Sequence, residues 1–295
     1  MLKNISLLVL LFVSAISNAQ TTNDKPKILY GVCTKTELET APYDAWFKKN
    51  YDDYTPNAAT VQAIKKESLK DISVKIFFGT WCGDSKREVP RFMKLLDAAG
   101  FPLSKVTLIA TGGGDSLYKQ SPQHEEAGLG IYKVPTFIFY RNGKEIHRIV
   151  EFPALSLEKD MLVIVQGKSY TPNYAAFINV DKWIADGTLL DSNISIRSLA
   201  LQIKPLVNSE YELNSLGYML LAQKKMKEAI SVFQMNYFLY PQSSNVASSL
   251  GEGYYEKGDY ENAVYYLENA LVKNTDPKAW RGILDILYKA KSLER

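Results

Sequence analysis

The 295-residue chain has few of the residues that build disulfide scaffolds or metal sites, because it contains two cysteines and two histidines. Two cysteines are too few for a disulfide framework, and neither histidine has a metal-ligand spacing to carboxylates or a cysteine. We therefore expect no metal and no cofactor. His147 is predicted to face solvent on a hairpin strand, and His124 to lie in a polar loop.

The chain also lacks an excess of charge. Its 35 basic and 32 acidic residues leave a formal net charge of +3, and the basic residues are scattered. This composition predicts no nucleic-acid or polyanion partner. The run Gly112-Gly113-Gly114 lacks the Lys-Ser/Thr pair of a phosphate-binding loop, so it predicts a flexible strand-to-helix loop near the active site.

No apolar run reaches the roughly 18–20 residues that a membrane-spanning helix requires. The apolar residues 5–16 follow Lys3 and precede the small-x-small pattern of residues 17–19, which is typical of a bacterial export signal. We predict a signal peptide cleaved after Ala19 and a periplasmic protein with no transmembrane anchor. The periplasm is oxidising and would supply disulfide substrates.

The most informative stretch that is present is Trp81-Cys82-Gly83-Asp84-Ser85. It follows an apolar, strand-like run at residues 74–78 and precedes a helical pattern that extends to about Ala99. A thiol at a helix N-terminus lies near unpaired N–H groups and the positive end of the helix dipole, which favour the thiolate. Because the thiolate is the nucleophile in disulfide exchange, this position predicts redox chemistry.

Together with a second motif, this stretch resembles the thioredoxin family. Residues 133–140, Lys-Val-Pro-Thr-Phe-Ile-Phe-Tyr, and the turn Asn142-Gly143 match the family's cis-proline, strand and hairpin. The resemblance covers roughly residues 71–167 and implies an α/β domain with a central mixed sheet flanked by helices. It also implies a set of site residues: Cys82 as the nucleophile, Trp81, Gly83, Asp84 and Ser85 as its motif, and Val134, Pro135 and Thr136 as the substrate-binding segment.

Two positions depart from the family pattern. The family's second cysteine is Ser85 here, which cannot resolve a mixed disulfide, and its buried acid corresponds to Ile76, which cannot relay protons. Release of a bound substrate would then need an external thiol or Cys33. Three interpretations of Cys33 stay open: an inert buried residue, a structural disulfide with Cys82, or a distant resolving thiol. Ser85 could donate a hydrogen bond to the thiolate, whereas the charge of Asp84 would oppose it.

The C-terminal third contains an internal repeat. Aligning residues 210–243 with 244–277 places Leu216-Gly217 on Leu250-Gly251 and Ala229 on Ala263, a period of 34 residues. This pattern resembles the tetratricopeptide repeat, which pairs two antiparallel helices. Two repeats need stacked neighbours for stability, so we expect the helices of residues 174–209 to pack against the first repeat.

The predicted organisation has six segments. They are a signal peptide (1–19), an N-terminal extension (20–58), a thioredoxin-like domain (59–170), connecting helices (171–209), two tetratricopeptide repeats (210–277) and a capping helix (278–295).

Three functions fit this organisation. The first is an exported monothiol enzyme, a thiol-disulfide oxidoreductase or isomerase in cell redox homeostasis, which acts on protein thiols or disulfides while the repeats recruit a partner protein. The second is a redox-inactive, peptide-binding or chaperone-like adaptor that uses the thioredoxin-like cleft and the repeats. The third is a structural role in which Cys82 and Cys33 are permanently bonded.

Overall fold

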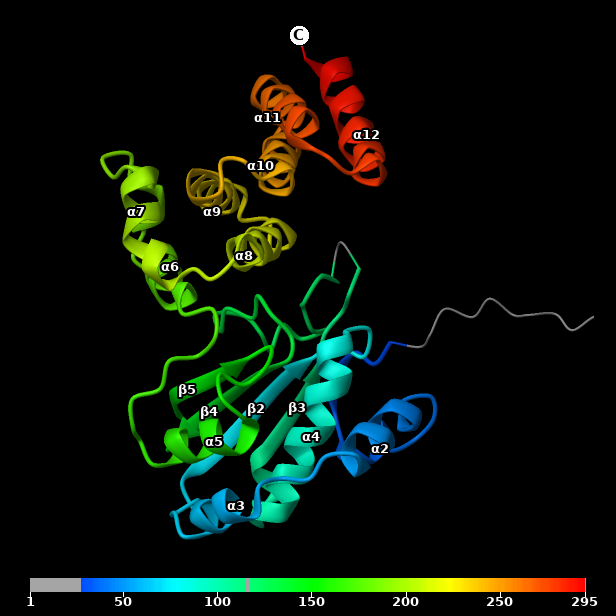
Figure 1. Cartoon of the computed structure of the whole chain (residues 1–295), viewed down its shortest axis with the longest axis vertical. Coiled ribbons are helices and arrows are strands. Elements are labelled where there is room, and N and C mark those ends of the chain that lie inside the picture. Colours follow the sequence, from blue (N-terminus) through cyan, green and yellow to red (C-terminus); the bar gives the residue numbers. More distant parts are fainter. Residues whose placement is uncertain (1–27, 115–116, 295) are drawn as a thin grey trace, which may run out of the picture.

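The computed structural model describes residues 28–114 and 117–294, so the predicted signal peptide lies outside the described residues. An α/β unit is followed by a unit made only of helices (Figure 1). Within the described ranges, no helix combines the length and the apolar character needed to cross a membrane.

The α/β unit is built on one five-stranded mixed sheet with the order β1-β3-β2-β4-β5. Strands β2 and β3 are parallel, whereas the other neighbouring pairs are antiparallel. This arrangement confirms the predicted mixed sheet. The strands are β1 (Gly31–Cys33), β2 (Ile72–Phe78), β3 (Val106–Ala110), β4 (Thr136–Arg141) and β5 (Lys144–Val150).

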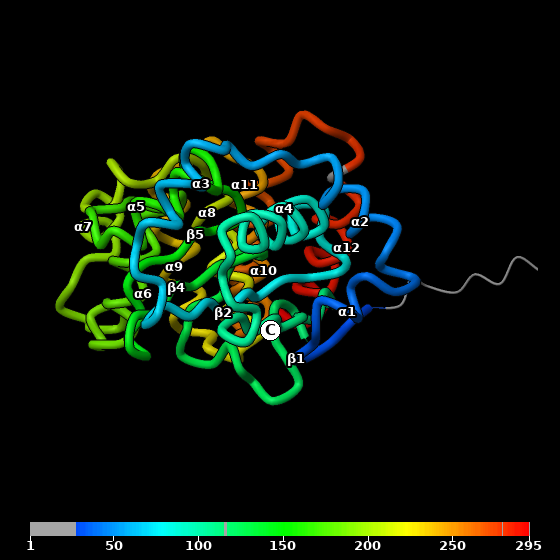
Figure 2. The backbone as a smooth tube through the Cα atoms, turned by 90° about the horizontal axis from the view of Figure 1, so that it is seen from below, coloured from blue at the N-terminus to red at the C-terminus, as the bar shows by residue number. Residues whose placement is uncertain are grey.

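Helices cover one face of this sheet. They are α1 (Lys35–Leu38), α2 (Asp44–Asp52), α3 (Ala58–Lys65), α4 (Gly83–Ala99) and α5 (Leu157–Val165). Alternate residues of β2, such as Val74, Ile76 and Phe78, pack into the core with these helices, while Phe77 joins a smaller cluster on the other face. Figure 2 shows α2 beside α4, with which it is in contact.

Part of the segment predicted as an N-terminal extension is built into the sheet. Strand β1 pairs with β3 at the edge, where Cys33 lies opposite Leu108. Phe47 of α2 is fully buried in the same core as α4. A three-residue strand is too short to produce a recognisable alternation, which explains why the sequence pattern does not reveal it.

The segment between β3 and β4 differs from the predicted strand-to-helix loop. Its described residues contain no α-helix and form a long loop over residues 111–135. An isolated bridge joins Gly112 to Tyr118, and the buried carboxylate of Glu126 accepts hydrogen bonds from the backbone and hydroxyl of Ser121. These contacts satisfy polar groups that a helix would otherwise pair internally.

The second unit is a run of helices consistent with all-α repeats. They are α6 (Ala176–Ala185), α7 (Ile196–Ile203), α8 (Glu210–Ala222), α9 (Met226–Leu239), α10 (Ser244–Lys257), α11 (Tyr260–Lys273) and α12 (Pro277–Leu293). Helices α8 and α10 begin 34 residues apart (210 and 244), and so do α9 and α11 (226 and 260). The structure thus reproduces the period of the sequence pattern.

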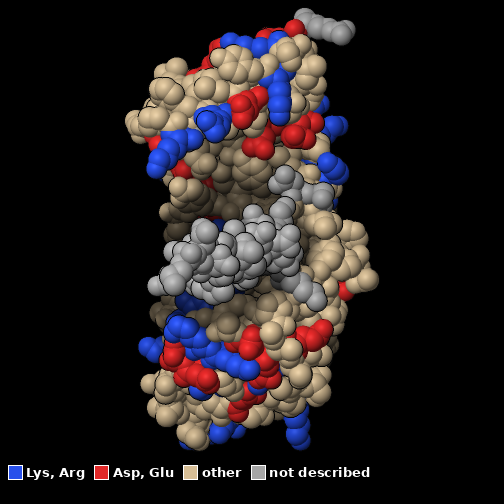
Figure 3. Space-filling model, turned by 90° about the vertical axis from the view of Figure 1, so that its right-hand side faces the viewer, with Lys and Arg blue, Asp and Glu red and all other residues tan. Residues whose placement is uncertain are grey.

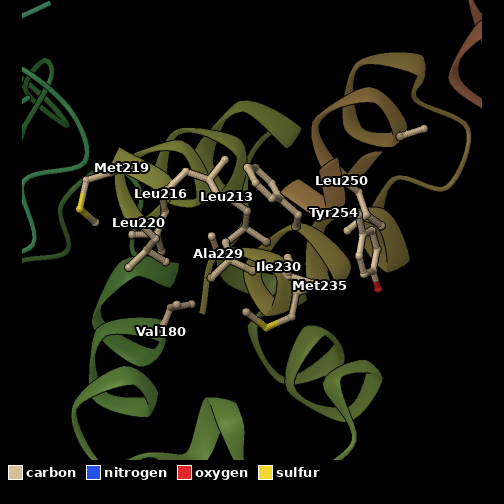
Figure 4. Packing of buried hydrophobic residues seen from close by; sticks show 14 of the residues in the cluster. Val180, Leu213, Leu216, Met219, Leu220, Ala229, Ile230, Met235, Leu250 and Tyr254 are labelled. Atoms are coloured by element: carbon tan, nitrogen blue, oxygen red, sulfur yellow. The ribbon is translucent and has the colours of Figure 1, made fainter. Parts of the chain in front are cut away.

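The helices of this unit share one core (Figure 4). Val180 of α6, Leu216 and Leu220 of α8 and Ile230 of α9 are buried together, so the connecting helices pack against the first repeat as predicted. Gly217 allows the close approach of α8 and α9, because a Cβ at this position would overlap the ring of Phe233. Helix α12 packs against α11 at the end of the run.

Candidate active site

Cys82 occupies the N-cap of α4, directly after the central strand β2. Its carbonyl oxygen accepts the first hydrogen bond of the helix, from the N–H of Lys86 at 3.0 Å. The side chain is partly exposed, and its thiol is free. The first turn of a 17-residue helix therefore lies beside a partly exposed sulfur.

The segment Val134-Pro135-Thr136 faces this thiol. The Cys82 Sγ donates a hydrogen bond to the carbonyl oxygen of Val134 at 3.3 Å, and the Val134–Pro135 peptide bond is cis. Thr136 begins β4 and is buried, and its hydroxyl donates to the carbonyl oxygen of Lys133 at 2.7 Å. The structure thus brings together the two predicted motifs, which lie 52 residues apart in the sequence.

Ser85 makes a different hydrogen bond from the one that the sequence suggests, and Asp84 is paired with a cation. Ser85 is fully buried, and its Oγ accepts a hydrogen bond from the N–H of Gly79 at 3.1 Å. No hydrogen bond joins Ser85 to Cys82 in the described part of the chain. The carboxylate of Asp84 pairs with Arg87 at 2.8 Å, which offsets the negative charge near the sulfur.

Trp81 is held in place beside Cys82 by a hydrogen bond from its indole nitrogen and by close packing against two glycines. Its Nε1 donates to the carbonyl oxygen of Thr111 at 2.9 Å. A Cβ on Gly79 or Gly113 would lie 2.5 Å or 2.7 Å from the indole, so both positions need glycine for this close packing. The ring of Tyr118 lies against the outer side, with 6.1 Å between ring centroids.

Cys33 lies apart from this site. It belongs to the core on the helix-covered face of the sheet, whereas Cys82 packs against the smaller cluster on the other face. Burial, with a smaller effect of Glu37, raises the pKa of Cys33 to about 12. A protonated thiol is a poor nucleophile, so this environment does not activate Cys33.

Lys119 is a site residue that the sequence analysis missed. It is 4% exposed, and its Nζ donates to the carbonyl oxygen of Tyr132 at 2.6 Å and lies 4.1 Å from the centre of the Tyr118 ring. Burial, reinforced by Lys133, lowers its pKa to about 7, although Glu151 and Cys82 act in the opposite direction. A lysine in a polar loop gives no sequence signal of burial, so only the tertiary structure reveals it.

A chain of contacts connects this site to the helical unit. Lys133, next to Val134, forms an ion pair with Glu151 at 3.2 Å, and Glu151 also accepts a hydrogen bond from Tyr174. The hydroxyl of Tyr132 donates to the carbonyl oxygen of Tyr174 at 3.0 Å. In addition, the side-chain amide of Gln120 donates to the carbonyl oxygen of Ala222 on α8 at 3.3 Å.

Neither histidine lies in a cluster that could bind a metal, and the described residues contain no group of three or more His, Cys, Asp or Glu side chains suited to one. His124 contacts the buried carboxylate of Glu126 at 3.1 Å. His147 lies on β5, where its ring packs edge-on against Tyr170. Both histidines therefore have structural contacts.

One comparison with known proteins supports the resemblance. A thioredoxin-like protein of Acanthamoeba polyphaga mimivirus is 31% identical to the chain over 101 residues, which are 32% of this chain and 64% of that protein. The match therefore spans less than two thirds of the relative's length. No protein-family model matches the chain, and no solved structure is significantly similar to it. The similarity and the mixed sheet with its flanking helices together assign a thioredoxin-like fold to the α/β unit.

Proposed function

We propose that this protein catalyses thiol-disulfide exchange on protein substrates through Cys82 as its single nucleophile. The observation that carries the proposal is the position of the Cys82 sulfur, at the N-terminus of α4 and 3.3 Å from the Val134 carbonyl oxygen. A substrate segment laid along Val134–Thr136 would bring its disulfide to that sulfur.

In the first step the Cys82 thiolate attacks one sulfur of the substrate disulfide. The substrate S–S bond breaks, a disulfide forms between Cys82 and the substrate, and the other substrate sulfur leaves as a thiolate that takes up a proton. For reduction, an external thiol then attacks the Cys82 sulfur, so the substrate leaves as a second thiol. A further thiol of the same class restores Cys82 and becomes part of an external disulfide. For isomerisation, the freed substrate thiolate attacks instead and no external thiol is consumed.

The location of Cys33 supports an external thiol as the resolving group. Cys33 packs in a core on the opposite face of the sheet from Cys82, and its pKa is raised. Ser85 has its oxygen committed to Gly79 and carries no thiol. The protein would therefore depend on a small-molecule or protein thiol.

The remaining parts of the proposal concern the helical unit and the location of the protein. The 34-residue offset of its helix pairs supports tetratricopeptide repeats, which would recruit a partner or substrate protein. The pattern of residues 1–19 supports export to the periplasm. There the protein would contribute to redox homeostasis.

Reduction of insulin by dithiothreitol, with wild type, Cys82→Ser and Cys33→Ser, tests this function. We expect Cys82→Ser to lose activity and Cys33→Ser to keep it. Loss of activity in both variants would assign the resolving step to Cys33. Equal activity in all three proteins and the uncatalysed control would refute the enzymatic proposal.

A redox-inactive adaptor is the second candidate, and one observation favours it. A cleft between the two units opens beside Tyr118, so polypeptide could be held there without turnover. An adaptor would bind unfolded protein equally well with Cys82→Ser and would accelerate no disulfide exchange. Suppression of the aggregation of an unfolded, cysteine-free protein would measure this binding.

A further inference from the structure

The cleft between the two units has a volume of about 500 Å³. One wall is Tyr118, from the loop after β3, and the opposite wall comes from the helical unit. Figure 3 shows a recess between the two units on one side of the molecule. The helical residues that line the cleft include Tyr218, Leu221, Met226, Glu252 and Glu256. Its volume falls within the range of about 300–1,000 Å³ that is typical of ligand sites.

The rings of Tyr118 and Trp81, whose planes are tilted by 38°, connect the cleft to the segment that carries the reactive thiol. Tyr118 contacts Trp81, the residue before Cys82, with 6.1 Å between ring centroids. Burial, with smaller effects of Cys82 and Glu151, raises the pKa of Tyr118. The bond from Gln120 to Ala222 holds the two walls together at this point. A polypeptide bound at Cys82 therefore has this cleft directly beside it.

The lining suits a long cationic side chain. Glu252 and Glu256 lie one turn apart on α10, and the hydroxyl of Tyr218 donates to Glu252 at 2.8 Å. Leu221 and Met226 add apolar surface beside the two tyrosine rings. Lysine and arginine have this combination of an apolar stem and a cationic end, and aromatic faces attract the cation. Lys224 also lines the cleft, so the lining holds two carboxylates, Glu252 and Glu256, and one ammonium group.

We propose that the cleft binds a lysine or arginine side chain of the substrate polypeptide, so that the helical unit selects which disulfides reach Cys82. This inference rests on the proposed exchange function and adds its substrate preference. Because the rings of Trp81 and Tyr118 lie between Cys82 and the cleft, the basic residue would lie a few residues from the substrate cysteine. Glu256 is the selecting carboxylate, because it is exposed at the cleft on α10.

Short peptides with one activated disulfide test the preference. Each peptide carries a cysteine bonded to 5-thio-2-nitrobenzoate and either lysine or glutamate about four residues away, on one side or the other. Attack by Cys82 on the peptide sulfur breaks this bond, forms a Cys82–peptide disulfide and releases the coloured thiolate. We expect the full-length Cys33→Ser protein to react about five- to tenfold faster with one of the lysine peptides than with its glutamate counterpart.

Charge variants of the helical unit test whether the lysine preference comes from the cleft. Glu256→Lys should abolish or reverse the preference for lysine. Glu261→Gln removes an exposed carboxylate on α11 that does not line the cleft, so it should keep the preference. The aromatic disulfide 5,5′-dithiobis(2-nitrobenzoate), which has no peptide, should react at the same rate with all these proteins. That reaction tests the chemistry of Cys82 separately from the cleft.

Three results would overturn the inference. The first is an equal rate with lysine and glutamate peptides, and the second is a lysine preference that persists in Glu256→Lys. The third is a dimer in sedimentation that Glu256→Lys dissociates, because a second copy of the chain would then occupy the cleft. If Cys82 reacts with no disulfide at all, the proposed function fails. Titration of cysteine-free peptides into Cys82→Ser, followed by tryptophan fluorescence, then still decides whether the cleft prefers lysine.

Discussion

The Oγ of Ser85 accepts a hydrogen bond from the backbone N–H of Gly79 at 3.1 Å, within a fully buried environment. The bond ties the first turn of α4 to the residue that follows β2. The position at which the thioredoxin family has a resolving cysteine thus has a structural role here, and it supports the loop that carries Trp81 and Cys82.

Replacing Ser85 by cysteine is expected to have two opposite effects. The free energy of unfolding should fall by about 1 kcal/mol, because sulfur is a weak acceptor for the Gly79 N–H. The mixed disulfide at Cys82 should nevertheless decay faster, because a second thiol now lies one helical turn away. Urea denaturation measures the first effect, and mass spectrometry of the trapped adduct measures the second. Ser85→Ala is the matched control, which should lose similar stability with no faster decay.

Substitutions at two neighbouring glycines distinguish a loss of Trp81 packing from a general effect on the loop. Gly113→Ala would place a Cβ 2.7 Å from the indole, whereas a Cβ at Gly114 has nothing within 4 Å. We expect Gly113→Ala to cost about 1–3 kcal/mol of stability, to shift tryptophan emission and to slow peptide exchange. Gly114→Ala should stay within about 0.5 kcal/mol of wild type. Equal behaviour of the two variants would show that the indole contact is unimportant.

Lys119 predicts how stability changes above neutral pH. Its pKa in the folded protein is about 7, compared with 10.5 for a free lysine. Between these values the unfolded chain binds the proton and the folded protein does not, so stability rises with pH from about 7 upward. Lys119→Met should remove this rise, which urea denaturation at several pH values from about 7 to 9 would detect. Lys65→Met, at an exposed position on α3, should leave the rise unchanged.

The burial of Glu212 predicts that stability changes with pH in the opposite direction at acidic pH. It is 1% exposed on α8. Burial raises its pKa to about 7, although the backbone N–H groups of Asn208 and Ala176 and the charge of Lys133 act in the opposite direction. Between its ordinary pKa of 4.5 and 7 the folded protein holds a proton that the unfolded chain releases, so stability falls as pH rises.

Glu212→Gln removes this proton equilibrium. The variant should melt several degrees higher than wild type near pH 8, because it buries no charge, and the gain should shrink toward pH 5. Thermal unfolding followed by circular dichroism measures both values. A gain in melting temperature that does not depend on pH would contradict the idea that the gain comes from removing a buried carboxylate. Glu261→Gln, at an exposed position, should show no pH-dependent gain.

Much of the fold follows from local patterns in the sequence. The apolar run at residues 74–78 lies within β2, and the helical pattern after Cys82 is α4. The 34-residue repeat reappears in the spacing of α8 and α10. Strand β1 escaped prediction because it is too short to alternate, and the loop over residues 111–135 was expected to lead into a helix.

The sequence by itself determined the two motifs of the site, their order, and the single thiol between a strand and a helix. Those features are local, because they depend on residue type and spacing within one element. The tertiary structure alone decided that Cys33 lies on the other face of the sheet, that Lys119 is buried near Cys82, and that the helical unit forms a wall beside Trp81 and Tyr118. These arrangements join residues far apart in the chain, and the packing of whole elements against one another fixes them.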